Sequence, residues 1–143
     1  MPKLPLKIKV PLSQAESYAK KIAPLIKGSE VIALIGELGS GKTTFTKALG
    51  KALGIKHSIP SPTFVMMQEF EIPKKGLKQK LFMYHLDLYR TKNFKEVESL
   101  GITEWWGHPK TVTVIEWADK IQSQLPKYTT IIYLHRDAKS DSN

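Results

Sequence analysis

The chain has 143 residues, of which 41% are hydrophobic, and this length and composition suit one compact α/β domain. Its 22 basic and 13 acidic residues give a formal net charge of +9, which favours polyanionic partners such as nucleotides, RNA or acidic protein surfaces. There is no cysteine, which excludes disulfides, thiolate metal sites and cysteine nucleophiles. Lysines interrupt the apolar residues of the first ten positions, and no stretch is long enough to span a membrane, so we expect a cytoplasmic protein.

The first half of the chain predicts two helices around a buried strand. Residues 4–10 suit an edge strand, and Ser13, with a glutamate three positions later, forms a capping box for a helix over 14–26. The unbroken apolar run 31–35 is rich in β-branched residues, as expected of a strand buried on both faces. Apolar residues then recur at helical spacing over 42–53. The predicted order is therefore edge strand, helix, buried strand, loop, helix.

The second half predicts strands on either side of short helices. Residues 64–72 and 80–89 suit an antiparallel pair, because the Pro-, Gly- and Lys-rich segment between them has the composition of an exposed hairpin tip. A short helix, a buried strand, one or two helical turns and a last strand are expected at 94–100, 112–115, 118–125 and 128–134. The small and polar residues 137–143 have nothing to bury, and we expect a disordered tail.

The loop between the buried strand and its helix carries the strongest chemical signal. Its sequence, GELGSGKT at 36–43, matches the P-loop pattern. Glycines allow the backbone to turn with positive φ, while N–H groups and the helix N-terminus direct positive charge at phosphate. Lys42 adds a full charge, and Thr43 offers its hydroxyl to Mg²⁺. We therefore predict ATP or ADP with magnesium, bound by Glu37, Leu38, Gly39, Ser40, Gly41, Lys42, Thr43 and Thr44.

Three further side chains are candidates for hydrolysing the nucleotide. Glu116 ends a buried strand, where P-loop proteins usually hold a second magnesium-binding acid; its alternative role is to cap a helix or pair with a lysine. Strand alternation places Asp87 on one face with His85 and directs it at the site, although both residues also fit a structural role. Thr63 follows Pro62 and is either a nucleotide-sensing hydroxyl or part of an ordinary proline turn.

Four segments taken together resemble the TsaE family, the small bacterial ATPases of tRNA threonylcarbamoyladenosine synthesis. The segments are GELGSGKTTF at 36–45, SPTF at 61–64, HLDLYR at 85–90 and VIEWADK at 114–120. The resemblance covers roughly residues 10–135. It implies a three-layer P-loop NTPase-like α/β fold with a mixed parallel and antiparallel sheet. It also implies magnesium bound by Thr43 and Glu116, Asp87 near the γ-phosphate, and Thr63 as the switch hydroxyl.

The same resemblance implies an accessory role. Such an ATPase is weak alone and works with a TsaD-like threonylcarbamoyl transferase and its TsaB-like paralogue at adenosine 37 of tRNAs. Two other classes stay open: a small-molecule kinase and a nucleotide-regulated module that binds RNA or protein. A kinase usually closes an arginine-bearing lid, and this chain has only Arg90 and Arg136. A binding module would use the lysines, or Trp105 and Trp106 as partner anchors.

Overall fold

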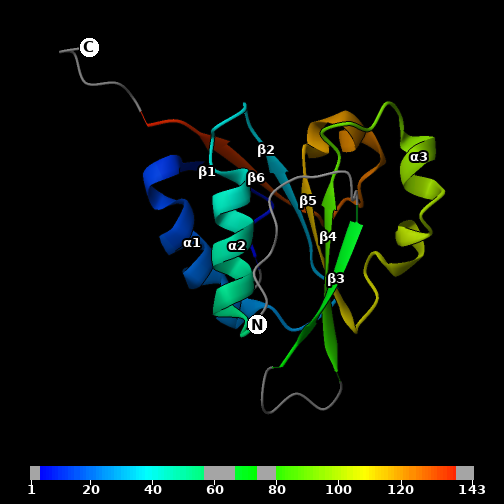
Figure 1. Ribbon diagram of the computed structural model, residues 1–143, viewed down its shortest axis with the longest axis horizontal. Helices are drawn as coiled ribbons and strands as arrows, with labels where there is room; N and C mark the ends of the chain where they lie inside the picture. Colours follow the sequence, from blue (N-terminus) through cyan, green and yellow to red (C-terminus); the bar gives the residue numbers. More distant parts are fainter. Residues whose placement is uncertain (1–3, 57–66, 74–79, 138–143) are drawn as a thin grey trace.

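The computed structural model describes residues 4–56, 67–73 and 80–137, and its centre is a six-stranded sheet (Figure 1). The strand order is β1-β6-β2-β5-β4-β3. Every neighbouring pair is parallel except β3 and β4, which are antiparallel, and this confirms the predicted mixed sheet. The strands are β1 (Lys7–Pro11), β2 (Val31–Ile35), β3 (Met67–Ile72), β4 (Leu81–Asp87), β5 (Thr111–Glu116) and β6 (Thr130–His135).

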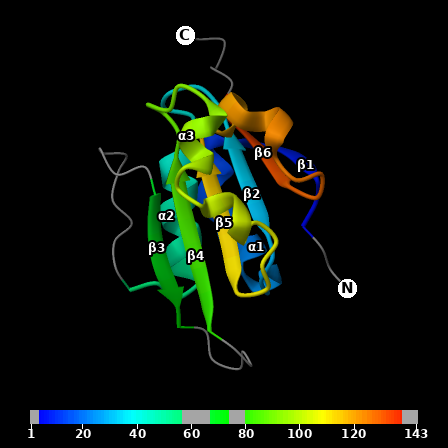
Figure 2. The ribbon, with the colours of Figure 1, turned by 90° about the vertical axis from the view of Figure 1, so that its right-hand side faces the viewer.

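Helices cover both faces of the sheet and complete three layers. The helices α1 (Ala15–Ile22) and α2 (Lys42–Ala52) pack together on one face. The helix α3 (Phe94–Glu98) and the 3₁₀ segments η3 (Ile102–Trp105) and η4 (Ala118–Gln124) lie on the other. Figure 2 shows α3 in front of the strands and α1 and α2 behind them. Two further 3₁₀ turns flank α1: η1 (Leu12–Gln14) and η2 (Ala23–Leu25).

The sheet separates two hydrophobic clusters because its central strands are apolar on both faces. In β2, Ile32 and Leu34 face the α1/α2 cluster, whereas Val31 and Ala33 face the cluster under α3 and η4. All six residues of β5 are buried as well. Strands covered by helices on both faces are expected to be apolar throughout, and this is the pattern that the sequence shows.

The first helix is shorter than predicted, and its cap differs. The helix α1 ends at Ile22, and the chain continues as the 3₁₀ turn η2, which contains Pro24. Proline has no N–H to donate to the preceding turn, so the α-helical ladder stops there. The capping box at Ser13 is wrong: Gln14 occupies the N-cap without a side-chain hydrogen bond. Ser13 instead donates its backbone N–H to Asp137 Oδ1 at 2.8 Å.

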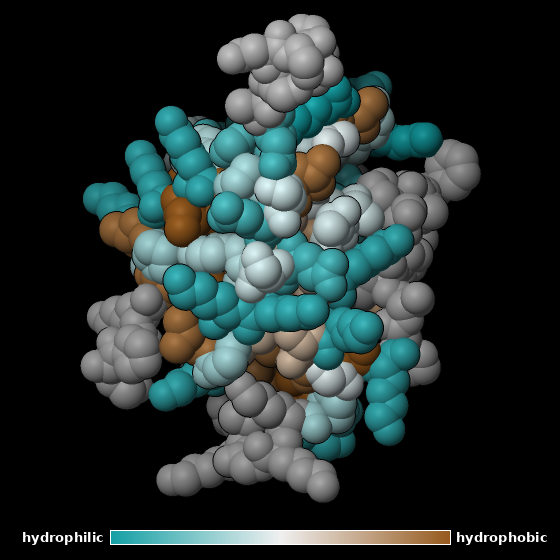
Figure 3. All heavy atoms as spheres, turned by 90° about the vertical axis from the view of Figure 1, so that its left-hand side faces the viewer, coloured by the Kyte–Doolittle hydropathy of each residue, from teal (hydrophilic) through white to brown (hydrophobic). Residues whose placement is uncertain are grey.

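Basic residues gather on the side of the molecule that carries α1. Figure 3 shows this side largely covered by hydrophilic side chains. Lys7 and Lys9 of β1 and Lys21 of α1 are exposed, and Lys20 makes an exposed ion pair with Glu16 at 3.2 Å. Exposed pairs of this kind contribute little to stability. Lys7, Lys9 and Lys21 therefore leave positive charge on this face.

The two adjacent tryptophans have different surroundings. Trp106 packs against the cluster under α3, with its ring 6.3 Å from that of Phe94. Trp105 is 40% exposed and stacks at 6.1 Å on Tyr84 and at 4.9 Å on His108. Only Trp105 keeps the exposure that a partner anchor needs.

Several sequence predictions fall outside the described ranges. These are the SPTF segment, most of the lysine-rich hairpin tip and the tail beyond Asp137. Within those ranges, no helix combines the length and apolar character needed to cross a membrane.

Phe45 provides a test of the packing between α1 and α2. Its side chain is fully buried, and its ring lies 6.4 Å from that of Tyr18. We expect Phe45→Ala to lower the free energy of unfolding by about 3–5 kcal/mol, because it removes buried contacts and leaves a cavity. Urea unfolding measures this loss. Leu6→Ala, at a side chain that is 58% exposed, is the matched control and should change stability by less than about 0.5 kcal/mol.

Candidate functional site

The candidate site lies where three parallel strands end side by side. In the sheet register, Leu34 of β2 is paired with Glu116 of β5, and Glu116 is paired with Asp87 of β4. The glycine loop leaves β2 at this same edge and leads into α2. Ligands of open α/β sheets bind outside the carboxyl ends of their strands. The topology therefore brings the loop and both carboxylates to one place.

The loop needs glycine at two positions for different reasons. Gly41 has φ +107°, and a Cβ atom there would lie 2.8 Å from Leu12 Cδ1. Gly36 has no positive φ, but a Cβ atom would meet Leu134 O and Ser40 Oγ at 2.4 Å each. The tight loop allows α2 to begin at Lys42, so that the first N–H groups of the helix point out of the loop. This is the geometry of an anion site.

Lys42 is buried in the loop, and oxygen atoms surround its ammonium. Nζ donates to Gly36 O at 2.5 Å, Glu37 O at 2.8 Å and Ser40 Oγ at 3.2 Å. Burial lowers the pKa of Lys42, and the nearby carboxylates, Glu116 foremost, oppose the shift. A desolvated ammonium in this position is a strong partner for an incoming anion, because few water molecules screen it.

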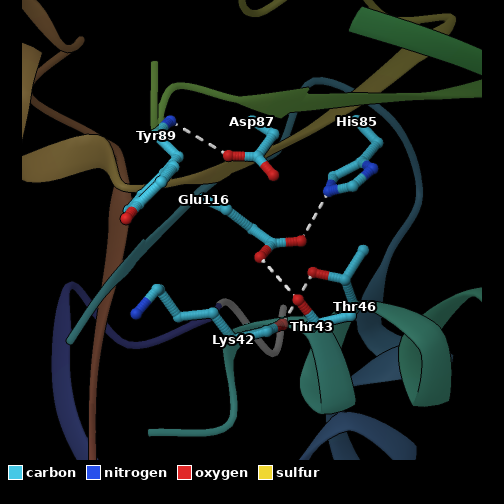
Figure 4. Close-up of polar contacts among 7 residues, drawn as sticks. All are labelled: Lys42, Thr43, Thr46, His85, Asp87, Tyr89 and Glu116. Atoms are coloured by element: carbon cyan, nitrogen blue, oxygen red, sulfur yellow. Dashed lines mark hydrogen bonds and ion pairs between the residues drawn. The ribbon is translucent and has the colours of Figure 1, made fainter. Parts of the chain in front are cut away.

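Glu116 links the helix α2 to two strands (Figure 4). Its Oε1 accepts a hydrogen bond from Thr43 Oγ1 at 3.1 Å, and its Oε2 lies 2.6 Å from His85 Nε2. The Glu116 and His85 side chains are 1% and 3% exposed. The hydrogen-bond partners of its two oxygens are thus a hydroxyl and an imidazole.

Asp87 lies beside Glu116 with half of its carboxylate unsatisfied. Oδ1 accepts the backbone N–H of Tyr89 at 3.0 Å, whereas the buried Oδ2 has no hydrogen-bond partner. Burial raises the pKa of Asp87, and the hydrogen bond from Tyr89 opposes this rise. A buried orphan acceptor costs free energy and calls for an explanation. An acceptor directed into a ligand site is one such explanation.

Trp117 lines the site next to Lys42. It has φ +61°, a left-handed conformation that is uncommon for a residue with a side chain and occurs at functional sites. Its ring lies 3.9 Å from Lys42 Nζ and 5.0 Å from the ring of Tyr89.

Lys120 Nζ donates to the carbonyl oxygens of Tyr89 and Thr91, which fixes the turn after β4 against η4.

A cleft of about 310 Å³ runs along the loop, near the lower end of the range of ligand pockets. Its outer end is apolar, formed by Leu12, which is 38% exposed, and Leu38, which is 68% exposed. Arg136 lies beside this end and donates from Nη2 to Leu38 O at 3.0 Å. The hydrogen bond between Ser13 and Asp137 ties the end of β6 to η1, so these walls are held together.

Comparison with known proteins agrees with this geometry. The family model "Threonylcarbamoyl adenosine biosynthesis protein TsaE" matches residues 11–143. The chain belongs to the TsaE family. The TsaE of Bacillus subtilis is 38% identical over 123 residues, which are 86% of this chain and 72% of that protein. The TsaE of Aquifex aeolicus is 41% identical over 112 residues, 76% of this chain and 74% of that protein.

A solved structure supports the same assignment. The crystal structure of Bacillus subtilis YdiB superposes with a TM-score of 0.63 at 31% identity, covering 92% of this chain and 76% of that chain. The P-loop NTPase-like fold implied by the resemblance is thus confirmed. As their shared name states, TsaE proteins belong to threonylcarbamoyladenosine biosynthesis.

Most of the predicted site residues come together. Lys42, Thr43, Glu116 and most of the loop line one cleft. Asp87 is paired with Glu116 in the sheet register but lies outside this lining, as do Glu37 and Ser40, and Thr63 lies outside the described residues. Their roles stay predictions. Sequence reasoning did not place Leu12, Trp117 or Arg136 in the site. Of these three residues, only Trp117 could have been found from the local sequence, because it directly follows Glu116 in the chain.

Asp87→Asn tests the buried carboxyl through the pH dependence of stability. Because the pKa is raised on folding, the folded chain holds this proton more tightly, and the carboxyl destabilises the fold as pH rises above its ordinary value of about 4. We expect the Asn variant to be more stable than the parent chain at pH 7–8, with no advantage below about pH 4.

Urea unfolding at a series of pH values measures this difference. Asp119→Asn, at an exposed carboxyl on η4, is the matched control. A difference between the Asp87 variant and the parent chain that is equal at every pH would contradict the assignment.

Proposed function

We propose that this chain is an accessory ATPase of tRNA threonylcarbamoyladenosine synthesis, which binds ATP on the loop from Gly36 to Thr44 and hydrolyses it. The observation that carries the proposal is the cleft lined by Lys42 and the Thr43–Glu116 pair, with the orphan acceptor of Asp87 next to Glu116 in the sheet register. Phosphate binding alone would require only the loop. The two carboxylates add groups suited to holding a metal ion and a water molecule.

The residues present fit a magnesium ion. Thr43 Oγ1 and Glu116 Oε1 are hard oxygen donors 3.1 Å apart. Adjacent ligands of an octahedral Mg²⁺ ion, each at about 2.1 Å, would lie about 3.0 Å from one another. Among the described residues no group of three or more acidic or histidine side chains forms a metal site, so phosphate and water oxygens would complete the shell, as Mg²⁺ prefers. When bound, the ion would neutralise charge on the phosphates.

Each side chain has a definite task in this proposal. Lys42 exchanges its carbonyl partners Gly36 and Glu37 for phosphate oxygens. Asp87, whose buried Oδ2 lacks a hydrogen-bond partner, would orient the attacking water molecule once the ligand is bound. The nucleobase end of ATP lies over the exposed Leu12 and Leu38. Thr63 remains the proposed switch hydroxyl.

The proposed partners follow from the pathway in the names of the relatives. The relatives carry the name of tRNA threonylcarbamoyladenosine biosynthesis proteins, and the proposed ATPase leaves the group transfer to other subunits. A TsaD-like transferase and a TsaB-like paralogue are the expected partners, with tRNA present in the same assembly. The cytoplasm, where ATP and tRNA are available together, is the proposed location.

Lys42→Ala tests the nucleotide site. It removes the buried ammonium, and we expect ATP affinity to fall by at least about 100-fold, as for loss of a charge-assisted contact in a desolvated site. Calorimetry measures the affinity, and mass spectrometry of tRNA measures the modification, which should be lost together. Lys51→Ala, at an exposed lysine on the same helix, is the control. Normal modification in cells that contain only the Lys42 variant would falsify the proposal.

Phosphate release tests the reaction class. With water as the only acceptor, we expect slow release by the chain alone and faster release after addition of the transferase and its paralogue. A kinase would instead require an added acceptor. Fast turnover that does not change with the partners would indicate a self-sufficient enzyme.

A further inference from the structure

The two oxygens of the Glu116 carboxylate have separate partners. Figure 4 shows one oxygen directed at Thr43 on α2 and the other at His85 on β4. A carboxylate only accepts hydrogen bonds, so His85 Nε2 is the donor across the 2.6 Å contact. The Glu116 oxygen that faces Thr43 is the one that the proposed function assigns to the metal ion. His85 therefore contacts Glu116 through one carboxylate oxygen and leaves the oxygen that faces the metal site available.

The burial of this pair is costly, which argues for a specific use. His85 and Glu116 are almost fully buried, and replacing buried polar pairs with apolar residues is often neutral or stabilising. On the face of the sheet that carries His85, Met83 of the same strand and Val114, its register partner in β5, belong to a hydrophobic cluster. The position would accept an apolar side chain on packing grounds alone.

We propose that His85 is a positioning residue that fixes the Glu116 carboxylate in the orientation needed to share a divalent cation with Thr43. The inference rests on the proposed function. A glutamate side chain has three rotatable bonds, and the hydrogen bond from a strand-borne ring removes the freedom of its last two. Loss of such an outer partner typically weakens metal binding by about 10- to 100-fold.

The effect should separate cation binding from nucleotide binding. The loop amides and Lys42 contact phosphate without involving His85, so ADP affinity in the absence of divalent cations should not change. Affinity for the cation in the presence of ADP should fall. A residue that only fills space would not produce this difference.

Three substitutions distinguish the donor from the bulk of the ring. His85→Gln keeps an N–H at about the position of Nε2, whereas His85→Asn has an N–H too close to the main chain to reach Glu116. His85→Leu removes the donor altogether. Thr46→Val is the control, because Thr46 is also fully buried and loses only a hydrogen bond to the Lys42 carbonyl within α2.

Electron paramagnetic resonance measures the binding of Mn²⁺ to the full chain saturated with ADP. Mn²⁺ is a suitable probe because it accepts the same oxygen ligands as Mg²⁺. We expect the Leu and Asn variants to bind Mn²⁺ about 10- to 100-fold more weakly, and the Gln and Thr46 variants to stay within about threefold of the parent chain. Calorimetry with EDTA should give equal ADP affinities for all five proteins.

Unchanged Mn²⁺ affinity in the Leu or Asn variant would overturn the inference, as would an equal loss in the Gln variant. If the Leu variant does not fold, as circular dichroism would reveal, the comparison of Gln with Asn decides. A parent chain that binds no ADP would refute the proposed function itself. A parent chain that binds ADP and Mn²⁺, with variants that do the same, would refute only the role of His85.

Discussion

The parallel pairing of β2, β5 and β4 is the constraint on which the site depends. Hydrogen bonding sets Leu34, Glu116 and Asp87 at the same height across three strands, so the loop that leaves β2 meets both carboxylates. A shift of one residue in β5 would direct Glu116 to the opposite face of the sheet, because side chains alternate along a strand. The buried apolar residues on both faces of β5 oppose such a shift.

This arrangement concentrates ionisable groups in a place with little water. Lys42, Glu116, His85 and Asp87 are all buried or nearly so. The opposing shifts of Lys42 and Asp87 have burial as their first cause, so each group is less stable charged here than in water. Such a cluster reduces the stability of the fold and increases the strength of each interaction with a ligand. Stability is thus exchanged for binding at this edge of the sheet.

Features that depend on local sequence could be predicted, and those that depend on distant contacts could not. GELGSGKT lies between an apolar run and a helical pattern, and alternation along 80–89 placed His85 and Asp87 on one face. The prediction at Ser13 failed because its N–H bonds to Asp137, 124 positions away. Arg136 reaches the loop only through the adjacency of β6 and β2, which no local pattern reveals.

The distribution of arginine gives a physical reason for the proposed dependence on partners. Rapid hydrolysis of a nucleoside triphosphate usually needs an additional cation on the γ-phosphate, often an arginine supplied by another subunit. The chain has two arginines, and neither belongs to the lining of the cleft. Arg136 lies at the outer end, where its guanidinium bonds to the Leu38 carbonyl, and Arg90 follows the turn beyond Asp87. Among the described residues, Lys42 is then the only cationic side chain in that lining, so a positive group from a partner would complete the proposed ATPase.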